Sequence, residues 1–250
     1  MKPKRPYQLH LSRGDTVLKD VEGRTQKFKK ILSILKDVEP NLAPAICLDL
    51  GCSSGIISSL LGEECRTVIG LDIDQEAVQY AKELRASSRV HFLIGDSMSL
   101  PFKEDSLDVI VCNHVYEHVP EATQLMQEVY RVLKKGGLCY FSAGNRYMIL
   151  EGHYGLPFLS WFPNTLGHIY LRWTGKGSFY YEKHLSLRKL RHLVRKFHVY
   201  DYTLRVIQDP ERFSADDLLR PHSLFHRWAR RVAPYVYPWI PTYLWVLTKE

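Results

Sequence analysis

Short apolar runs alternate with segments of helical spacing along the first part of the chain. The apolar runs have the length of buried strands and span residues 45–50, 67–72, 90–94, 107–113 and 138–143. The segments with apolar residues three or four positions apart predict helices over residues 24–38, 55–62, 74–86 and 120–133. An alternation of this kind is typical of a mostly parallel sheet with helices on both faces.

The second part of the chain is less regular. Residues 186–197 return to helical spacing, residues 198–207 alternate as a strand, and residues 242–248 form a last apolar run. We therefore predict an α/β fold with a doubly wound, Rossmann-like, mostly parallel sheet of seven strands and with insertions after the fifth and sixth strands. This single domain over residues 1–250 divides into an N-terminal helical region (1–44), the regular half (45–143), two insertions (144–185 and 208–241), and the final helix and strands (186–207 and 242–250).

Charge and aromatic residues are concentrated in the second part. The chain holds 34 Lys and Arg against 27 Asp and Glu, a net charge of +7, and residues 1–150 contribute none of this excess. Residues 151–250 carry all five Trp and 20 of the 30 aromatic residues. The overall content of 45% hydrophobic and 24% charged residues excludes wholesale disorder. We therefore expect a neutral half followed by a basic, aromatic surface with a different role.

The cysteines and the apolar runs indicate in which cellular compartment the protein is expected. The five cysteines are odd in number and none has C-x-x-C spacing, which argues against a disulfide framework or a zinc site and indicates a reducing compartment. The N-terminal stretch lacks an apolar run of signal-peptide length, and no run approaches the ~18 apolar residues of a spanning helix. We expect a cytoplasmic protein without a metal site, either free or peripheral on a membrane.

Polar segments follow directly after the first two predicted strands. The sequence Asp49–Gly55 (DLGCSSG) joins a strand to a helix, but it lacks the second glycine of a G-x-G-x-x-G loop and the lysine of a phosphate-binding loop. This favours a nucleoside-like ligand without phosphates, and Asp49 suits a ligand that carries an ammonium and a sulfonium. Asp72, at the end of the second strand, is placed to accept from two ribose hydroxyls, whereas Asp74 fits the N-cap of the next helix.

The third and fourth strands are followed by further candidates. Asp96 begins a loop in which its carboxylate can accept from an adenine amino group. The fourth strand runs through Asn113 into a segment that holds His118. His118 and, in the first insertion, His153 are candidate catalytic residues for acid–base chemistry or for orienting an acceptor. The alternatives are that His118 starts a helix and that His153 is an ordinary loop histidine.

Taken in order, these segments resemble the class I S-adenosylmethionine-dependent methyltransferases of the type 11 kind. The segments that match the ordered motifs of this family, over roughly residues 46–143, are DLGCSSG, GLDID, GDSMSLPFKEDSLDVIVCNHVYEHV and RVLKKGGL. Two positions depart from the pattern, because Ser53 stands at a usual glycine and Lys135 at a usual proline. The resemblance implies an enzyme whose cofactor, S-adenosylmethionine, is bound by residues 45–143 and whose acceptor lies on the side of the two insertions.

The resemblance also implies which residues meet each part of the cofactor. By the family pattern the methionine end meets Asp49 and Gly51, the ribose meets Asp72, the methyl group meets Asn113, and the adenine meets Ile73, Asp96 and Ser97. The complete set of cofactor-binding candidates is Asp49, Gly51, Cys52, Ser53, Gly55, Asp72, Ile73, Asp96, Ser97, Met98 and Asn113.

The sequence does not identify the acceptor. Methyl transfer from a sulfonium is an in-line displacement, for which the protein aligns the acceptor and excludes water. The aromatic residues within 151–181 fit a cover over such a site. We favour a small-molecule or lipid-linked acceptor, methylated on oxygen, carbon or nitrogen. The alternatives are an RNA or protein methyltransferase and a non-catalytic protein that binds the cofactor for regulation or assembly.

Residues 220–240 interleave Arg with Trp, Tyr and Pro. This composition fits a segment that lies on an anionic membrane surface, and equally a core-packed helix with a basic outer face. Nucleic acid is a less favoured partner, because the basic residues are spread among apolar ones and form no dense cluster. The oligomeric state is left open.

Overall fold

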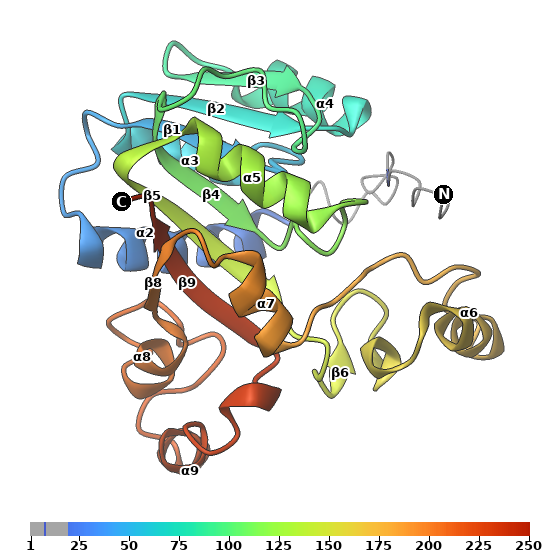
Figure 1. The fold of residues 1–250 in the computed structure, drawn as a ribbon. Coiled ribbons are helices and arrows are strands. Elements are labelled where there is room, and N and C mark those ends of the chain that lie inside the picture. Colours follow the sequence, from blue (N-terminus) through green and yellow to red (C-terminus); the bar gives the residue numbers. More distant parts are fainter. Residues whose placement is uncertain (1–7, 9–19) are drawn as a thin grey trace.

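The centre of the molecule is a seven-stranded sheet, seen in a computed structural model that describes residue 8 and residues 20–250 (Figure 1). The strands lie in the order β3-β2-β1-β4-β5-β9-β8. Neighbouring strands are parallel except for β9, which is antiparallel to both β5 and β8. The bounds are β1 Ile46–Leu50, β2 Thr67–Asp72, β3 Val90–Ile94, β4 Leu107–Asn113, β5 Leu133–Gly144, β8 His198–Asp201 and β9 Thr242–Thr248. The prediction of a doubly wound, mostly parallel sheet is confirmed.

Helices cover both faces of this sheet. Neighbouring residues of a strand point to opposite faces, so Cys47 and Leu48 of β1 belong to two different buried clusters. The cluster with Cys47 takes in side chains of α2, α3, α4 and α8, and the cluster with Leu48 takes in side chains of α5 and α7. The bounds are α2 Val21–Val38, α3 Ile56–Glu64, α4 Gln75–Arg85, α5 Ala122–Val132, α7 Leu187–Leu193 and α8 Thr203–Gln208.

The two predicted insertions carry short elements outside the sheet. The first begins at the carboxyl end of β5 and extends away from the sheet (Figure 1). Its elements are β6 Leu150–Glu151, β7 Leu156–Pro157, the 3-10 helix η1 Leu159–Trp161 and α6 Asn164–Trp173. The second insertion contains α9 Leu224–Val232 and the 3-10 helix η2 Tyr237–Trp239. Both insertions therefore add surface beyond the layers that form the core.

The strand predicted over residues 198–207 is wrong in its second half. β8 ends at Asp201, and the chain then turns into α8. Oδ1 of Asp201 accepts a hydrogen bond from the amide of Thr203 (2.9 Å) at the start of this helix. Tyr202 and Val206, four positions apart, are both buried. Apolar residues at this even spacing fit one face of a helix as well as the period of a strand, so the sequence pattern was ambiguous here.

The N-terminal helical region is described from Asp20 onward, together with Gln8. Asp20 is the N-cap of α2, and its carboxylate accepts from the amide of Gly23 (2.9 Å). Residues 1–7 and 9–19, which include most of the stretch considered as a leader, lie outside the described residues. Among the helices of the described part, none combines the length and the apolar character that crossing a bilayer requires.

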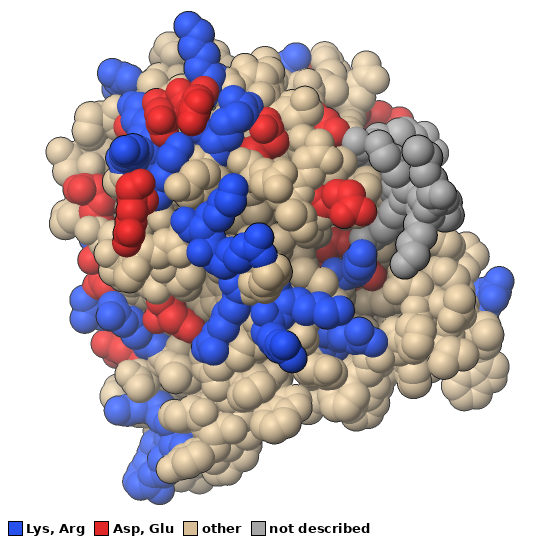
Figure 2. Space-filling model, viewed as in Figure 1, with Lys and Arg blue, Asp and Glu red and all other residues tan. Residues whose placement is uncertain are grey.

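Basic side chains gather on one face of the molecule. Figure 2 shows Lys and Arg over the region of α7 and again near α9, where Figure 1 places the second insertion. On α7, Arg188, Lys189 and Arg191 are exposed, whereas Leu190 is buried against α5 and the sheet. The charged residues of α7 thus form a solvated face over an apolar one, as the helical spacing predicts.

Candidate functional site

The loop after β1 is shaped by two glycines in the left-handed region. Gly51 has φ +75° and Gly55 has φ +74°. The amide of Gly51 donates to the carbonyl of Leu71 (2.8 Å), which ties the loop to β2. A Cβ atom at Gly55 would lie 2.5 Å from Cζ of Phe92, so no larger residue fits between the loop and β3. The glycines therefore bring the backbone sharply from β1 into α3.

Ser53 stands in this loop where the family pattern has a glycine. Its φ of +48° lies in the left-handed region, which a serine adopts at some cost in strain. The amide of Ser53 donates to Oδ2 of Asp72 (2.8 Å), and its hydroxyl accepts from Nη2 of Arg24 on α2 (3.3 Å). These contacts hold Ser53 in place and link the loop to both β2 and α2.

Asp72 is fixed at the end of β2 by backbone amides. Besides Ser53, the amide of Asp74 donates to Oδ1 of Asp72 (2.9 Å). Burial raises the pKa of Asp72, although backbone hydrogen bonds from Asp74, Ser53 and Ile73 oppose the shift. Each carboxylate oxygen keeps a second lone pair, which leaves acceptor capacity for hydroxyl groups. Asp74 caps α4 by accepting from the amide of Ala77 (3.2 Å), so its predicted N-cap role is confirmed. Ile73, between Asp72 and Asp74, is half-buried.

Asp49 lies deeper than a typical surface acid. Its side chain is buried in β1, and Oδ2 accepts a short hydrogen bond from the hydroxyl of Ser58 (2.6 Å). Burial raises the pKa of Asp49 to about 6, a shift that the bond from Ser58 reduces. The side chain of Cys52 packs in the core cluster, so only its backbone is available to a ligand in the loop. Asp49 thus titrates closer to neutral pH than an ordinary carboxyl group does.

The remaining cofactor candidates lie at the ends of β3 and β4. Oδ1 of Asp96 accepts from the amide of Met98 (2.8 Å), which shapes the loop after β3. Asp96 and Ser97 are half-buried, and the side chain of Met98 packs in the core. Asn113 is the half-buried last residue of β4. The predicted residues therefore line the carboxyl ends of four adjacent strands, in the order β3-β2-β1-β4.

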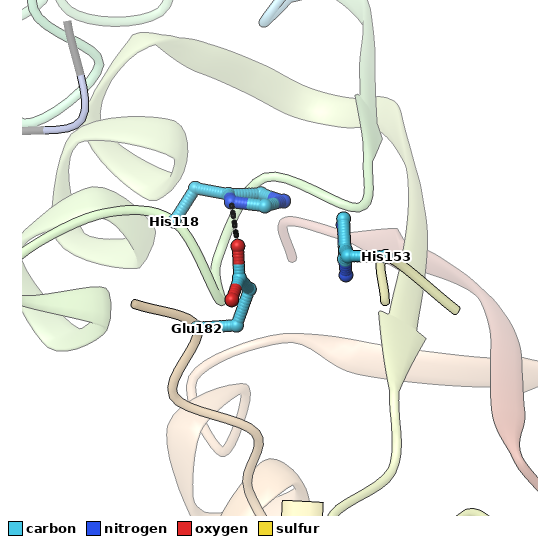
Figure 3. Close-up of side chains that lie close together, drawn as sticks. All are labelled: His118, His153 and Glu182. Carbon is cyan, nitrogen blue, oxygen red and sulfur yellow. Dashed lines mark ion pairs between the residues drawn. The ribbon is translucent and has the colours of Figure 1, made fainter. Parts of the chain in front are cut away.

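The two candidate histidines come together from distant parts of the chain (Figure 3). The rings of His118 and His153 meet edge to face with centroids 4.8 Å apart. Nδ1 of His118 lies 2.9 Å from Oε1 of Gln8 and 3.8 Å from Oε1 of Glu182. Burial lowers the pKa of His118 to about 4, against the attraction of Glu117, so the ring is neutral at pH 7. The alternative that His118 starts a helix is wrong, because α5 begins at Ala122.

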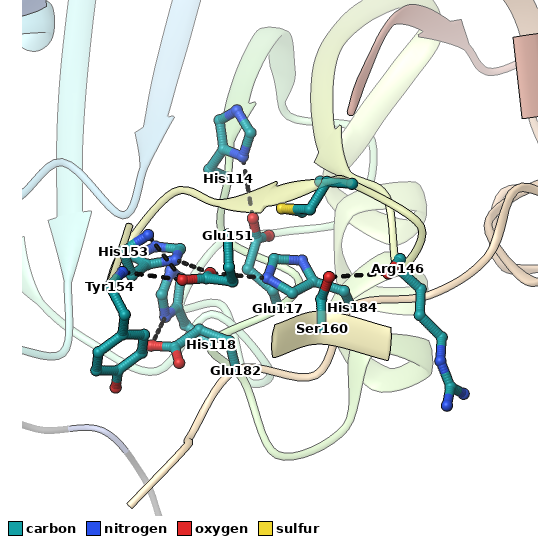
Figure 4. A network of polar contacts seen from close by, with 12 residues as sticks. His114, Glu117, His118, Arg146, Glu151, His153, Tyr154, Ser160, Glu182 and His184 are labelled. Atoms are coloured by element: carbon teal, nitrogen blue, oxygen red, sulfur yellow. Dashed lines mark hydrogen bonds and ion pairs between the residues drawn. The ribbon is translucent and has the colours of Figure 1, made fainter. Parts of the chain in front are cut away.

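His153 belongs to a network around Glu151 (Figure 4). Oε1 of Glu151 lies 2.7 Å from Nδ1 of His153 and 3.3 Å from Nε2 of His184. Its other oxygen accepts from the amides of His153 and Tyr154, both at 2.9 Å. Burial works against the charge of Glu151, but the imidazole hydrogen bonds hold its pKa well below the usual range. Burial likewise opposes the charged form of His153, yet the bond to Glu151 raises its pKa.

A second carboxylate, Glu117, is fully buried beside this network. Its Oε1 lies 3.0 Å from Nδ1 of His114, a residue with φ +55° directly after β4. Burial alone would raise the pKa of Glu117, but His114 and the other imidazoles hold it at about 2. A buried carboxylate that stays charged needs such partners.

Sequence reasoning did not single out four members of this cluster: His114, Glu151, Glu182 and His184. The contact between Glu151 and His184 spans 33 residues of an irregular insertion, so no period in the sequence places them together. The sequence did contain one signal: from residue 114 onward, histidines and acidic residues repeatedly occur within a few positions of one another, as at His114, Glu117 and His118.

Comparisons with known proteins agree on one domain type. Residues 48–141 match the type 11 family model described as a methyltransferase domain. A protein of Mycolicibacterium smegmatis named as a probable S-adenosylmethionine-dependent methyltransferase is 34% identical over 147 residues, which cover 59% of this chain and 56% of that protein. A ubiquinone biosynthesis O-methyltransferase of Pseudomonas fluorescens is 31% identical over 114 residues, 44% of this chain and 49% of that one. The chain thus spans about half the length of the curated relatives it matches.

Solved structures share the fold over most of the chain. An S-adenosylmethionine-dependent methyltransferase of Mesorhizobium loti superposes with a TM-score of 0.58 at 18% identity, covering 88% of this chain and 98% of that one. The protein solved in complex with the Trm112 methyltransferase activator of Haloferax volcanii has a TM-score of 0.57 at 20% identity, covering 94% of both chains. Identities this low show the fold alone.

Proposed function

We propose that this chain, a class I S-adenosylmethionine-dependent methyltransferase of the type 11 family by its match over residues 48–141, transfers a methyl group to a small-molecule or lipid-linked acceptor. The observation that carries the proposal is the cradle formed by the loop after β1. Its backbone is bound to Asp72 through Ser53 and to β2 through Gly51. This arrangement leaves an oriented carboxylate beside a glycine turn at the carboxyl edge of the sheet, where α/β folds bind nucleotides.

The residues of the cradle fit the cofactor of this family. Asp72 would bind the ribose hydroxyls, with Ile73 against the adenine and Asp96 at its edge. Asp49 supplies a buried acid for the cationic methionine end, and at Gly51 a Cβ atom would come within 2.9 Å of Val115, so the backbone there has no room for a side chain. S-adenosylmethionine supplies the methyl group on its sulfonium, and the chain binds and orients it.

The acceptor side would be formed by the segment after β4 and by the first insertion. Asn113 ends β4, and the same segment continues to His118, which contacts His153 of the insertion. A neutral imidazole with a pKa of about 4 is a weak proton acceptor, so we assign His118 to orienting the acceptor. We assign His153 to the same role, because its ring contacts His118 and is held by Glu151 through Nδ1. Such orientation is the main contribution that an in-line displacement requires.

Two observations support a small or lipid-like acceptor. The Pseudomonas fluorescens relative is named for O-methylation in ubiquinone biosynthesis. The first insertion exposes large apolar side chains, with Trp173 82% and Ile149 67% exposed, which suit contact with an apolar acceptor or its carrier.

We also propose that residues 220–240 lie on an anionic membrane. On α9, Leu224, Phe225 and Trp228 are 82%, 61% and 57% exposed, so these residues are not packed on the core as the alternative interpretation requires. Exposed arginines stand on the same helix (Figure 2), at positions Arg227, Arg230 and Arg231. A helix with an exposed apolar face and flanking arginines suits an anionic lipid surface.

The enzymatic proposal is tested by incubating the purified chain with S-adenosylmethionine and separate small-molecule, lipid, RNA and protein extracts. Formation of S-adenosylhomocysteine with the first or second extract is expected. Formation of S-adenosylhomocysteine with the RNA extract alone would instead support the alternative of an RNA methyltransferase. Cofactor binding without turnover on any extract, protein included, would support a regulatory or assembly protein.

A further inference from the structure

Two imidazoles and one buried carboxylate meet between the segment after β4 and the first insertion (Figure 3). His118, His153 and Glu182 each offer one ligand atom, and these atoms lie within 4.8 Å of one another. We propose that these three side chains bind a divalent transition-metal ion of the Zn²⁺ class.

The donor set and the spacing fit such an ion. Two imidazoles and one carboxylate form a common set for zinc and for other divalent transition metals. A tetrahedral zinc ion with bonds of ~2.0–2.2 Å keeps its ligand atoms about 3.3 Å apart. The three side chains therefore need to approach one another by at most ~1.5 Å, which side-chain rotation can supply, and a fourth position is left for a water molecule.

The contacts of Glu151 select this ligand set over a neighbouring one. Glu151, His153 and His184 also lie close enough to share an ion. However, both oxygens of Glu151 already accept hydrogen bonds, from two imidazoles and two backbone amides. A metal-binding histidine usually donates its second ring N–H to a carboxylate of this kind, which fixes the ring. Glu151 therefore orients His153 through Nδ1 and leaves Nε2 for the ion.

His118 presents a lone pair toward the same point. Its Nδ1 lies 2.9 Å from Oε1 of Gln8, which is an acceptor, so the tautomer that satisfies this contact has its proton on Nδ1. The lone pair then lies on Nε2, the ring nitrogen that Figure 3 shows on the side of His153.

Among the three carboxylates of the cluster, Glu182 is the one whose contact with an imidazole, that of His118 at 3.8 Å, is longer than a hydrogen bond. Glu117 has His114 at 3.0 Å, and Glu151 has His153 at 2.7 Å. Glu182 is only 2% exposed, its Oε1 has a long contact with Nε2 of Gln8 (3.4 Å), and its Oε2 has no hydrogen-bond partner among residue 8 and residues 20–250. A buried carboxylate is costly without a positive partner, and a bound cation supplies one.

The expectation of no metal site came from the cysteines, and the proposed ligands are of other types. They also come from three separate segments, at residues 118, 153 and 182. A pattern based on local spacing does not find such a set.

The test uses the full chain without an affinity tag, stripped with a chelator and titrated with Zn²⁺ against a chromophoric competitor. One ion per chain is expected. His153→Ala and Glu182→Gln should each weaken binding at least tenfold, and Glu151→Gln should weaken it ~10–100-fold by releasing His153. His192→Ala, at an exposed histidine of α7, is the matched control and should bind as the native chain does.

Co²⁺ gives a second measurement on the native protein, because visible d–d bands report nitrogen and oxygen ligands in low coordination. Glu182→Gln is nearly isosteric, and its melting temperature shows whether the variant is folded. Absence of stoichiometric binding to the native chain would overturn the proposal. So would native affinity in both His153→Ala and Glu182→Gln. Neither result depends on methyl transfer, so the metal site and the proposed activity can fail separately.

Discussion

Replacement of Asp72 by alanine is the sharpest test of the cofactor cradle. The carboxylate accepts from the amides of Ser53 (2.8 Å) and Asp74 (2.9 Å), which orients it at the end of β2. In the proposed complex its remaining lone pairs accept from two ribose hydroxyls. Asp72→Ala therefore removes the ligand contacts and also releases the loop that carries Ser53.

The magnitude follows from hydrogen bonds to a charged acceptor. Each such bond contributes about 1.5–3 kcal/mol, and part of the loss is recovered when water solvates the freed groups. We expect a net loss of ~1.5–3 kcal/mol in cofactor binding, which is roughly ten- to a hundredfold in affinity. Asp72→Asn keeps one carbonyl acceptor and should fall between the native protein and Asp72→Ala.

Calorimetric titration with S-adenosylhomocysteine measures the effect. Asp74→Ala is the matched control, because it removes the N-cap of α4 at a cost of about 1 kcal/mol in stability. Its affinity for S-adenosylhomocysteine should stay within about twofold of the native value. Native affinity in a folded Asp72→Ala protein would refute the ribose role. An equal loss in both variants would show that the loss comes from general destabilisation.

Three further predictions concern other parts of the molecule. Since the pKa of Asp49 is about 6, this acid is mostly protonated in the free protein at pH 5, whereas a cationic ligand end favours its charged form. Affinity for S-adenosylhomocysteine should therefore rise about tenfold from pH 5 to pH 7, and Asp49→Asn should remove that rise. If His118 orients the acceptor, His118→Ala should lower turnover ~10²-fold with cofactor affinity nearly intact, and parallel losses of affinity and melting temperature would contradict that role. If α9 binds lipid, the chain should sediment with anionic but not neutral vesicles, and less of it should sediment at high salt. A triple Arg→Ser change at residues 227, 230 and 231 should remove ~1 kcal/mol of vesicle-binding free energy per arginine. Absence of sedimentation with either vesicle would exclude the membrane role.

The regular half of the fold was predictable because each strand there contains a short run of mostly apolar residues in the sequence. The ranges 67–72, 107–113 and 242–248 agree with β2, β4 and β9 residue for residue. The edge of the sheet was harder, since β8 is exposed and short and the buried positions that follow it fit strand and helix alike.

The candidate site divides in the same way. The cofactor loop is local, and Asp49, Asp72 and their glycines could be located from strand ends alone. The acceptor side depends on contacts such as Glu151 with His184, which the chain makes across an insertion without a period. His118 and His153 were found individually, but their meeting with Glu182 is a property of tertiary structure.

The position of β9 has a consequence for how the domain assembles. β9 follows β8 in the chain yet lies between β8 and β5, and among the described strands β8 pairs with β9 alone. During synthesis, therefore, the cofactor-binding strands can pair with one another while β5 still presents an open edge and β8 has no neighbour. Open edges of this kind are where chains aggregate. A truncation upstream of residue 242 would thus remove an interior strand, and a nascent chain of that length would be a natural client for chaperones that shield unpaired edges.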